Sequence, residues 1–130
     1  MIQTIQQERA KFALDKVNTA ITDNVNQKEF KSYASGLPAM IHMNGLGQAA
    51  AFYKSKVKSN EHQILYAILS EWLAAEGQPY YDSSLPTNKK RDLLEGITML
   101  DMATYQLAQA EALALTDWVK KFAKAFMEEE

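Results

Sequence analysis

Two histidines, His42 and His62, are the only imidazole side chains in the chain. Imidazole suits acid–base catalysis and metal binding because its pKa lies near neutral pH. Neither histidine belongs to an HExxH motif, and the chain has no cysteine to supply a thiolate ligand. His42 stands in an apolar run, so we expect it to be a hydrogen-bonded structural residue. The sequence therefore predicts no metal site and no cofactor.

No other set of residues indicates a catalytic centre. Ser–His–Asp chemistry requires a nucleophile held against a base, and the chain has no nucleophile elbow. Carboxylate pairs such as Glu71 with Glu76 and Asp92 with Glu95 have the spacing that is common on solvated helix faces. We expect no catalytic residue, and hence a protein that is not an enzyme.

The Gly45-Leu46-Gly47 element has two glycines in an otherwise apolar stretch. It lacks the preceding strand and third glycine of a dinucleotide-binding turn, and the Lys-Ser/Thr of a P-loop. Each glycine inside a helix costs about 1 kcal/mol relative to alanine. Two structural explanations remain open: Asn44 caps a new helix where the old one breaks, or the small residues up to Ala51 admit another backbone at close range.

Basic residues form three clusters: Lys54, Lys56 and Lys58; Lys89, Lys90 and Arg91; and Lys120, Lys121 and Lys124. Cations in the last turn of a helix are favoured by its dipole by about 0.3 to 1 kcal/mol, which explains the first and third clusters without a ligand. The second cluster falls in an expected first turn, where cations are disfavoured. It is therefore the better candidate for an anion site on physical grounds, with a solvated face as the alternative.

The chain has 130 residues, a length typical of one domain, and a formal net charge of -2. We expect a single helical domain over residues 1–130, with the acidic tail 128–130 frayed. No apolar run approaches the roughly 20 residues of a membrane-spanning helix. With no cysteine and no signal peptide at the start, the sequence predicts a cytoplasmic protein that does not associate with membranes.

Apolar residues recur at spacings of three and four, which predicts helices and no strand. We expect a first helix from Thr4 to Thr22 with Thr4 as N-cap. A short helix from Gln27 should end at Gly36, so that Pro38 lies in the first turn of the next helix.

Ser59 or Asn60 should cap a core helix that Gly77 ends. After a loop over residues 77–88, Thr87 or Asn88 should open a helix that is interrupted near Gly96. The final helix should reach Phe126 along a stripe that begins with Ile97, Leu100 and Thr104. The expected fold is all-α, a compact bundle of five to six helices with a long C-terminal helix, in which the two tryptophans anchor the core.

Two segments of the chain carry the hallmarks of a known family. LPAMIHMNGLGQAAAFYKSK, residues 37–56, has an apolar turn followed by NGLGQ, a small-residue run, an aromatic and Ser-Lys. YQLAQAEALALTDWVKKFAKA, residues 105–125, has a Tyr before an EAL segment and a Trp before a basic ending. The chain resembles the small subunit, the fifth Cmr protein, of the type III-B CRISPR effector complex (the Cmr RAMP module). The matching motif residues are Asn44, Gly45, Gly47, Gln48, Tyr105, Glu111 and Trp118.

The resemblance implies a non-catalytic, all-α subunit of an RNA-guided RNA-silencing complex in antiviral defence. Its implied partners are other Cmr subunits, especially the RAMP backbone subunit, copies of itself in a filament, and the guide RNA with its target RNA. Base pairing between the guide and the target would then supply specificity, and the protein would contact only the RNA backbone.

The family's pattern has basic residues at five positions of this chain, which are our first candidates for RNA contact: Lys54, Lys56, Lys120, Lys121 and Lys124. Lys89, Lys90 and Arg91 are second candidates, and Arg9, Lys11 and Lys16 have no such support. Family members often carry arginine where this chain has Gln106, so no basic contact is expected there. The alternative function is a helical protein–protein adaptor with no nucleic-acid contact; an enzyme would require His42 and His62 to be adjacent.

Overall fold

The structure is a computed structural model that describes residues 2–74 and 93–127. These ranges contain six helices and no strand, so the predicted all-α fold is confirmed. The helices are α1 (Ile5–Thr22), α2 (Gln27–Asn44), α3 (Leu46–Ser55), α4 (Asn60–Leu73), α6 (Leu93–Ile97) and α7 (Met102–Phe126). No helix in the described ranges is long and apolar enough to span a membrane.

The start of α1 agrees with the sequence prediction. Thr4 is the N-cap, and its hydroxyl accepts a hydrogen bond from the Gln7 N–H at 3.1 Å. The Gln7 side chain in turn accepts a hydrogen bond from the Thr4 N–H at 2.9 Å, which completes a capping box. Ser59 is the N-cap of α4, and its hydroxyl accepts a hydrogen bond from the His62 N–H.

Helix α2 differs from the prediction, because it continues through Gly36 and Pro38 to Asn44. Its buried side chains are Phe30, Ala34, Leu37 and Ile41, which follow one helical face on both sides of the expected break. Burial of this continuous stripe compensates for the hydrogen bond that Pro38 cannot donate. The predicted end at Gly36 is therefore wrong.

The interruption before the last helix lies directly after Ile97, which agrees with the predicted break near Gly96. Asp101 is the N-cap of α7, and its carboxylate accepts a hydrogen bond from the Thr104 N–H at 2.8 Å. This hydrogen bond favours the ionised carboxylate and lowers the pKa of Asp101. The expected boundaries at Gly77, Thr87 and Asn88 lie outside the described residues, as does the tail 128–130.

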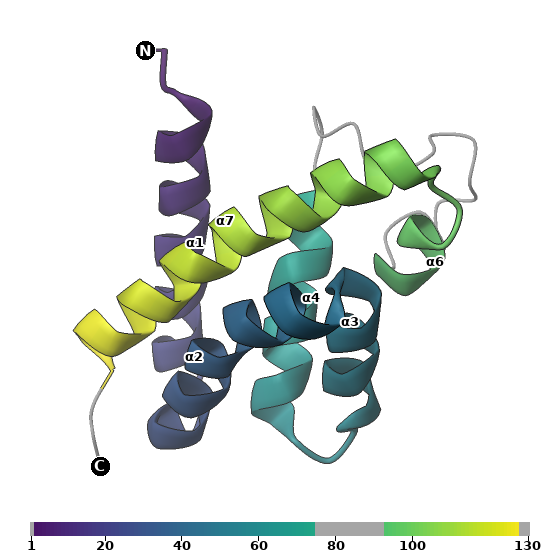
Figure 1. The fold of residues 1–130 in the computed structure, drawn as a ribbon. Helices are drawn as coiled ribbons and strands as arrows, with labels where there is room; N and C mark the ends of the chain where they lie inside the picture. The colour runs from purple at the N-terminus through teal and green to yellow at the C-terminus, as the bar shows by residue number, and fades with distance from the viewer. Residues whose placement is uncertain (1, 75–92, 128–130) are drawn as a thin grey trace.

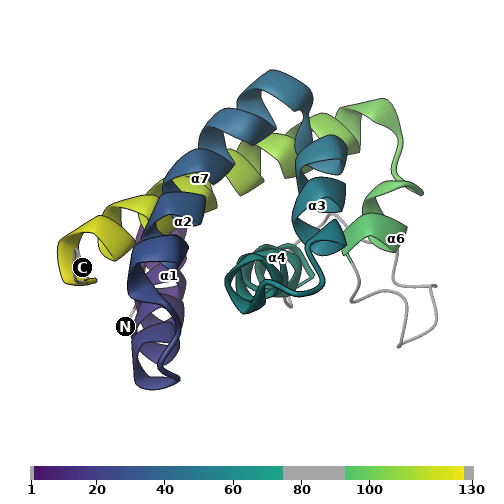
Figure 2. The ribbon, with the colours of Figure 1, turned by 90° about the horizontal axis from the view of Figure 1, so that it is seen from below.

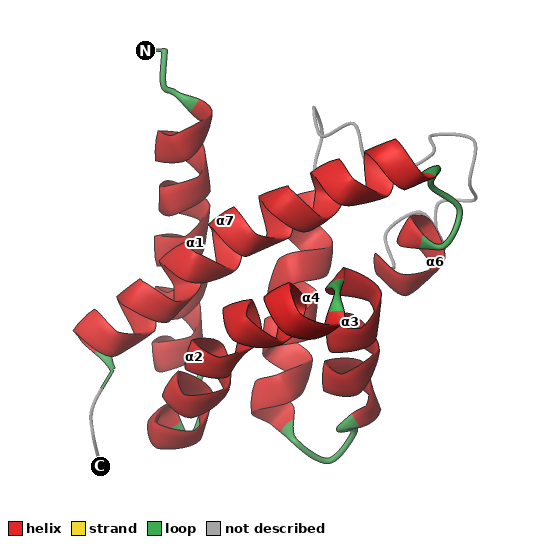
Figure 3. Cartoon of the chain, viewed as in Figure 1, coloured by secondary structure: helices red, strands yellow, loops and turns green. Residues whose placement is uncertain are grey.

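Helix α7 extends across the whole molecule (Figure 1). Its C-terminal half packs against α1 and α2, and its first turns lie near α3 and α6. Figure 2 shows α2 lying along α7. In the same view α4 is seen nearly end-on, with α1 and α2 on one side of it and α3 and α6 on the other. Figure 3 shows that the connections between α1, α2, α3 and α4 are short. The long helix thus holds the two ends of the bundle together.

The core lies where α1, α2, α4 and α7 meet, and its apolar residues follow the predicted stripes closely. Trp72 is buried, with its ring centroid 5.0 Å from that of Phe12. The predicted stripes are wrong at their outer ends, since Ile5 is 50% exposed and Phe126 is 55% exposed. Both residues lie at helix ends, beyond the neighbouring helices that would cover them.

Candidate functional site

The two family hallmarks of the sequence meet at the start of α3. Gly45 has φ 89° and ψ 157°, and it both ends α2 and begins α3 without a side-chain cap of its own. The Gly47 N–H donates to the Tyr105 hydroxyl at 2.8 Å, and the Leu46 N–H donates to Gln109 Oε1 at 2.8 Å. Because α7 supplies both acceptors, α3 is capped by a distant part of the chain.

This geometry bears on both explanations for the glycines. The helix breaks here, but Asn44 is the last residue of α2 and does not cap α3, so that part of the prediction is wrong. A Cβ atom on Gly47 would lie 3.2 Å from the Tyr105 hydroxyl, so the close neighbour is a side chain rather than another backbone. Ala49 is buried beyond it, whereas Gln48 is exposed.

Glu111, from the second hallmark, is buried and joins three helices. Arg9 on α1 donates to it from Nε at 2.6 Å and from Nη2 at 2.8 Å, and Trp72 on α4 donates from Nε1 at 2.8 Å. The side chains of Arg9 and Glu111 are only 13% and 9% exposed. The two motif residues Tyr105 and Glu111 therefore hold the fold together, and Arg9 is directed into the protein instead of toward a ligand.

Trp118, the last motif residue, is half-buried on α7. Its ring stacks on Phe122 one turn later, with centroids 5.3 Å apart and planes at 25°. Phe122 in turn lies 6.2 Å from Phe126. These three rings form a row of aromatic contacts along α7.

The ammonium groups of Lys54 and Lys56 both lie over aromatic rings. Lys54 Nζ is 4.6 Å from the centroid of Tyr66, and Lys56 Nζ is 4.6 Å from that of Phe52. Cation–π contacts at exposed positions contribute about 0.5 to 1 kcal/mol. Both lysines are exposed, so these contacts orient the two charges without removing them from solvent.

Lys120, Lys121 and Lys124 lie on the last turns of α7 and have different surroundings. Lys121 Nζ pairs with Asp117 at 2.8 Å, Lys120 is half-buried, and Lys124 is exposed. The end of α7 and the end of α3 lie on opposite sides of the molecule (Figures 1 and 2). The structure therefore does not bring the two predicted lysine clusters together, and Lys89, Lys90 and Arg91 lie outside the described residues.

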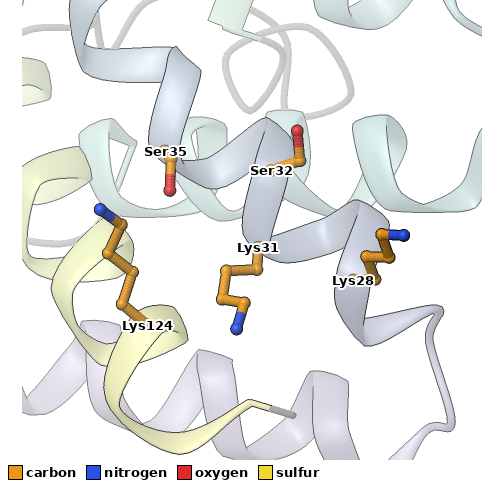
Figure 4. Close-up of a pocket in the computed structure, with 5 residues that line it drawn as sticks. All are labelled: Lys28, Lys31, Ser32, Ser35 and Lys124. Atoms are coloured by element: carbon orange, nitrogen blue, oxygen red, sulfur yellow. The ribbon is translucent and has the colours of Figure 1, made fainter. Parts of the chain in front are cut away.

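A hollow of about 360 Å³ opens beside Lys124, between the first turns of α2 and the end of α7 (Figure 4). The residues that line it are Lys28, Lys31, Ser32, Ser35 and Lys124. Lys28 and Lys31 were not predicted, because they are distant from Lys124 in sequence. Their spacing of three residues, which puts them on one helix face, was the available signal.

His42 and His62 occupy separate places. The His62 ring is buried, stacks on Tyr33 at 3.9 Å, and its Nδ1 lies 2.7 Å from Ser59 Oγ. Burial, helped by nearby Lys56, lowers the pKa of His62. His42 is exposed in the last turn of α2, nine residues and thus about 13 Å along the helix from Tyr33.

Neighbouring Tyr53 donates its hydroxyl hydrogen to the Tyr33 carbonyl oxygen at 2.7 Å, and burial raises its pKa to about 12. In the part of the chain that the structure describes, no three His, Asp or Glu residues are placed to hold a metal ion.

The family model of the CRISPR-associated protein Cas_Cmr5 matches residues 5–126. The chain belongs to the Cmr5 family. Among members of this family, the CRISPR system Cmr subunit Cmr5 of Thermus thermophilus is 30% identical over 128 residues, which cover 98% of this chain and all of that protein. The X-ray crystal structure of a Cmr5 family protein from the same organism has a TM-score of 0.77 and 28% identity, over 97% of this chain and all of that one. The resemblance seen in the sequence is thus confirmed.

Proposed function

We propose that the protein is a non-catalytic subunit of a type III-B Cmr complex, in which it contacts target RNA without sequence specificity. The observation that carries this proposal is the family match over residues 5–126, which includes both halves of the Tyr105–Gly47 contact. The Thermus relative carries the name of a Cmr subunit. The guide RNA would select the target by base pairing, and this subunit would support the paired strands.

Exposed lysines support the RNA contact. Lys54, Lys56 and Lys124 present ammonium groups on the surface of the described residues. An ammonium group is a point charge on a flexible stem, which suits contacts to phosphates of any sequence. Such contacts weaken as salt rises, because binding releases counterions from the RNA.

Exposed apolar side chains support contacts with protein. Around the start of α7, Met99 is 58% exposed, Met102 is 76% exposed and Leu107 is 60% exposed. A rigid helical body with two complementary faces can stack head to tail into an open filament. These side chains therefore favour packing against copies of the chain or against the RAMP backbone subunit. They also favour the alternative function, an adaptor that binds protein only.

Reconstitution of a Cmr complex on a guide RNA, with and without this chain, tests the proposal. We expect the chain to enter the complex and to raise its affinity for target RNA. Exclusion from the complex, or equal affinity without the chain, would contradict the proposal. Cleavage of RNA by the purified chain would contradict its non-catalytic part.

A charge-reversal variant separates the two functions. It replaces Lys54, Lys56, Lys120, Lys121 and Lys124 with glutamate. If the variant assembles normally and its complex binds target RNA several-fold more weakly, the subunit contacts RNA. If it assembles and the affinity is unchanged, the adaptor function is correct.

A further inference from the structure

We infer that the lysine-lined hollow between α2 and α7 binds a phosphate of the RNA backbone. This inference rests on the proposed function and assigns it a specific site. Three ammonium groups and two hydroxyls from two helices line the hollow, and none of the five lining residues is acidic or aromatic. Figure 4 shows Lys124 on α7 facing Ser35 on α2 across the opening.

The position of Lys28 argues for an anionic ligand. Lys28 lies in the first turn of α2, which begins at Gln27 after the N-cap Asn26. The helix dipole disfavours a cation at this end by about 0.3 to 1 kcal/mol, so the helix itself does not account for a lysine here. A bound anion would offset that cost, because it would interact favourably with both the ammonium group and the helix end.

Lys31, the middle lysine of the lining, contacts the end of α7. Its Nζ lies 3.5 Å from the carbonyl oxygen of Met127, at the C-terminal end of α7. Lys31 is half-buried, whereas Lys28 and Lys124 on either side are exposed. The arrangement places one held charge between two that can move toward a ligand.

The lining also indicates which part of RNA would bind. Proteins bind unpaired bases mainly by stacking them on aromatic rings, and this hollow has none. Ammonium and hydroxyl groups instead donate hydrogen bonds to phosphate oxygens. The volume of about 360 Å³ lies within the range of small-ligand sites. The site therefore fits a backbone phosphate and has no means of reading the base.

The test compares two double variants of the full-length chain with equal loss of charge. Lys28→Gln with Lys124→Gln removes the two exposed cations of the hollow and leaves Lys31 in place. Lys11→Gln with Lys16→Gln removes two lysines of α1 that are not among the proposed RNA contacts, and it serves as the control. The affinity for a short single-stranded RNA of mixed sequence is measured over a series of salt concentrations, for the isolated chain and for the reconstituted complex.

We expect the hollow variant to lose affinity several-fold and its dependence of log K on log[salt] to become shallower by about 1. The control variant should bind as the wild type does. In NMR spectra, RNA should shift the amide signals of Ser32 and Ser35. Equal losses in both variants, or RNA-induced shifts confined to the end of α3, would overturn the inference.

Failure of the proposed function has a different signature. In that case the wild-type chain would be excluded from the complex, or its presence would leave the affinity for target RNA unchanged. If the wild-type chain and the hollow variant raise the affinity of the complex for target RNA equally, the proposed function stands. The hollow is then not part of the RNA-binding surface.

Discussion

The hydroxyl of Tyr105 accepts a hydrogen bond from the backbone N–H of Gly47, 58 positions earlier in the chain. With Gln109, which accepts from the Leu46 N–H, it supplies the cap that Gly45 cannot provide. The family hallmarks around these residues are thus two halves of one structural joint.

Tyr105→Phe should lower the free energy of unfolding by about 1 kcal/mol, because it removes the hydrogen-bond acceptor of a half-buried N–H and leaves the ring in place. Urea denaturation followed by circular dichroism measures the change. Gln106→Ala, at an exposed position next to Tyr105, is the control and should have almost no effect. A Tyr105→Phe variant as stable as the wild type would show that the cap contributes nothing.

Gly45→Ala and Gly36→Ala should have effects of opposite sign. Gly45 has φ 89° and ψ 157°, a conformation open essentially to glycine alone, so alanine should cost about 1 to 3 kcal/mol. Gly36 lies inside α2 with nothing within 4 Å of an added Cβ, so alanine should stabilise by about 0.5 to 1 kcal/mol. Thermal denaturation of both variants checks the pair, and destabilisation by Gly36→Ala would contradict the continuous α2.

Glu111→Ala should destabilise the protein by about 3 to 5 kcal/mol, because it leaves the Arg9 guanidinium and the Trp72 N–H buried without this partner. The double variant Glu111→Leu with Arg9→Met should cost much less than the sum of its single changes. Lys121→Ala breaks an exposed pair with Asp117 and should cost less than about 1 kcal/mol. Chemical denaturation measures all of these variants, and additive effects of the Glu111 and Arg9 changes would show that the pair is uncoupled.

Stability should fall as the pH decreases below about 6.5, through the titration of His62. The folded state lowers the pKa of His62 by burial, so in this pH range the unfolded chain binds more protons than the folded one. The contribution of neutral His62 to stability is complete above the pKa that His62 has in the unfolded chain. It is lost as the pH falls toward the lower pKa that His62 has in the folded protein. The midpoint of urea unfolding, measured from about pH 7.5 to 5.5, checks this.

His62→Phe keeps an aromatic ring against Tyr33 and should flatten the pH dependence in that interval. The matched control is His42→Gln, which removes the other imidazole at an exposed position. If the slope persists in His62→Phe, another group is responsible for it.

Local signals in the sequence were sufficient for much of the fold. The Thr4 and Ser59 caps are made by side chains within three residues of their targets, so both were predictable. The end of α2 was mispredicted. Gly36 favours a helix end, but burial of the apolar stripe keeps the helix intact, and that burial depends on the helices that cover the stripe. Contacts between distant segments decide such cases, and one sequence does not contain them.

The candidate site also shows this difference between local signals and contacts of distant segments. Lys124 was identified from its cluster, but its partners in the hollow are on a helix almost a hundred positions earlier. Glu111 was recognised as a motif residue, whereas its pairing with Arg9, 102 positions away, required the fold. The sequence therefore predicted which side chains matter, but it did not predict which of them lie together in the fold.

The distant cap of α3 also bears on how the chain folds during synthesis. A nascent chain leaves the ribosome from its N-terminus, and the first amides of α3 gain their acceptors Tyr105 and Gln109 only after residues 105–109 have emerged. The contact between Arg9 and Glu111 likewise forms only after residue 111 has emerged. We expect ribosome-bound chains that end before Tyr105 to leave α3 open to proteases, with protection appearing only once α7 is exposed. Synthesis of α7 therefore determines when α1 and α3 can complete their native contacts.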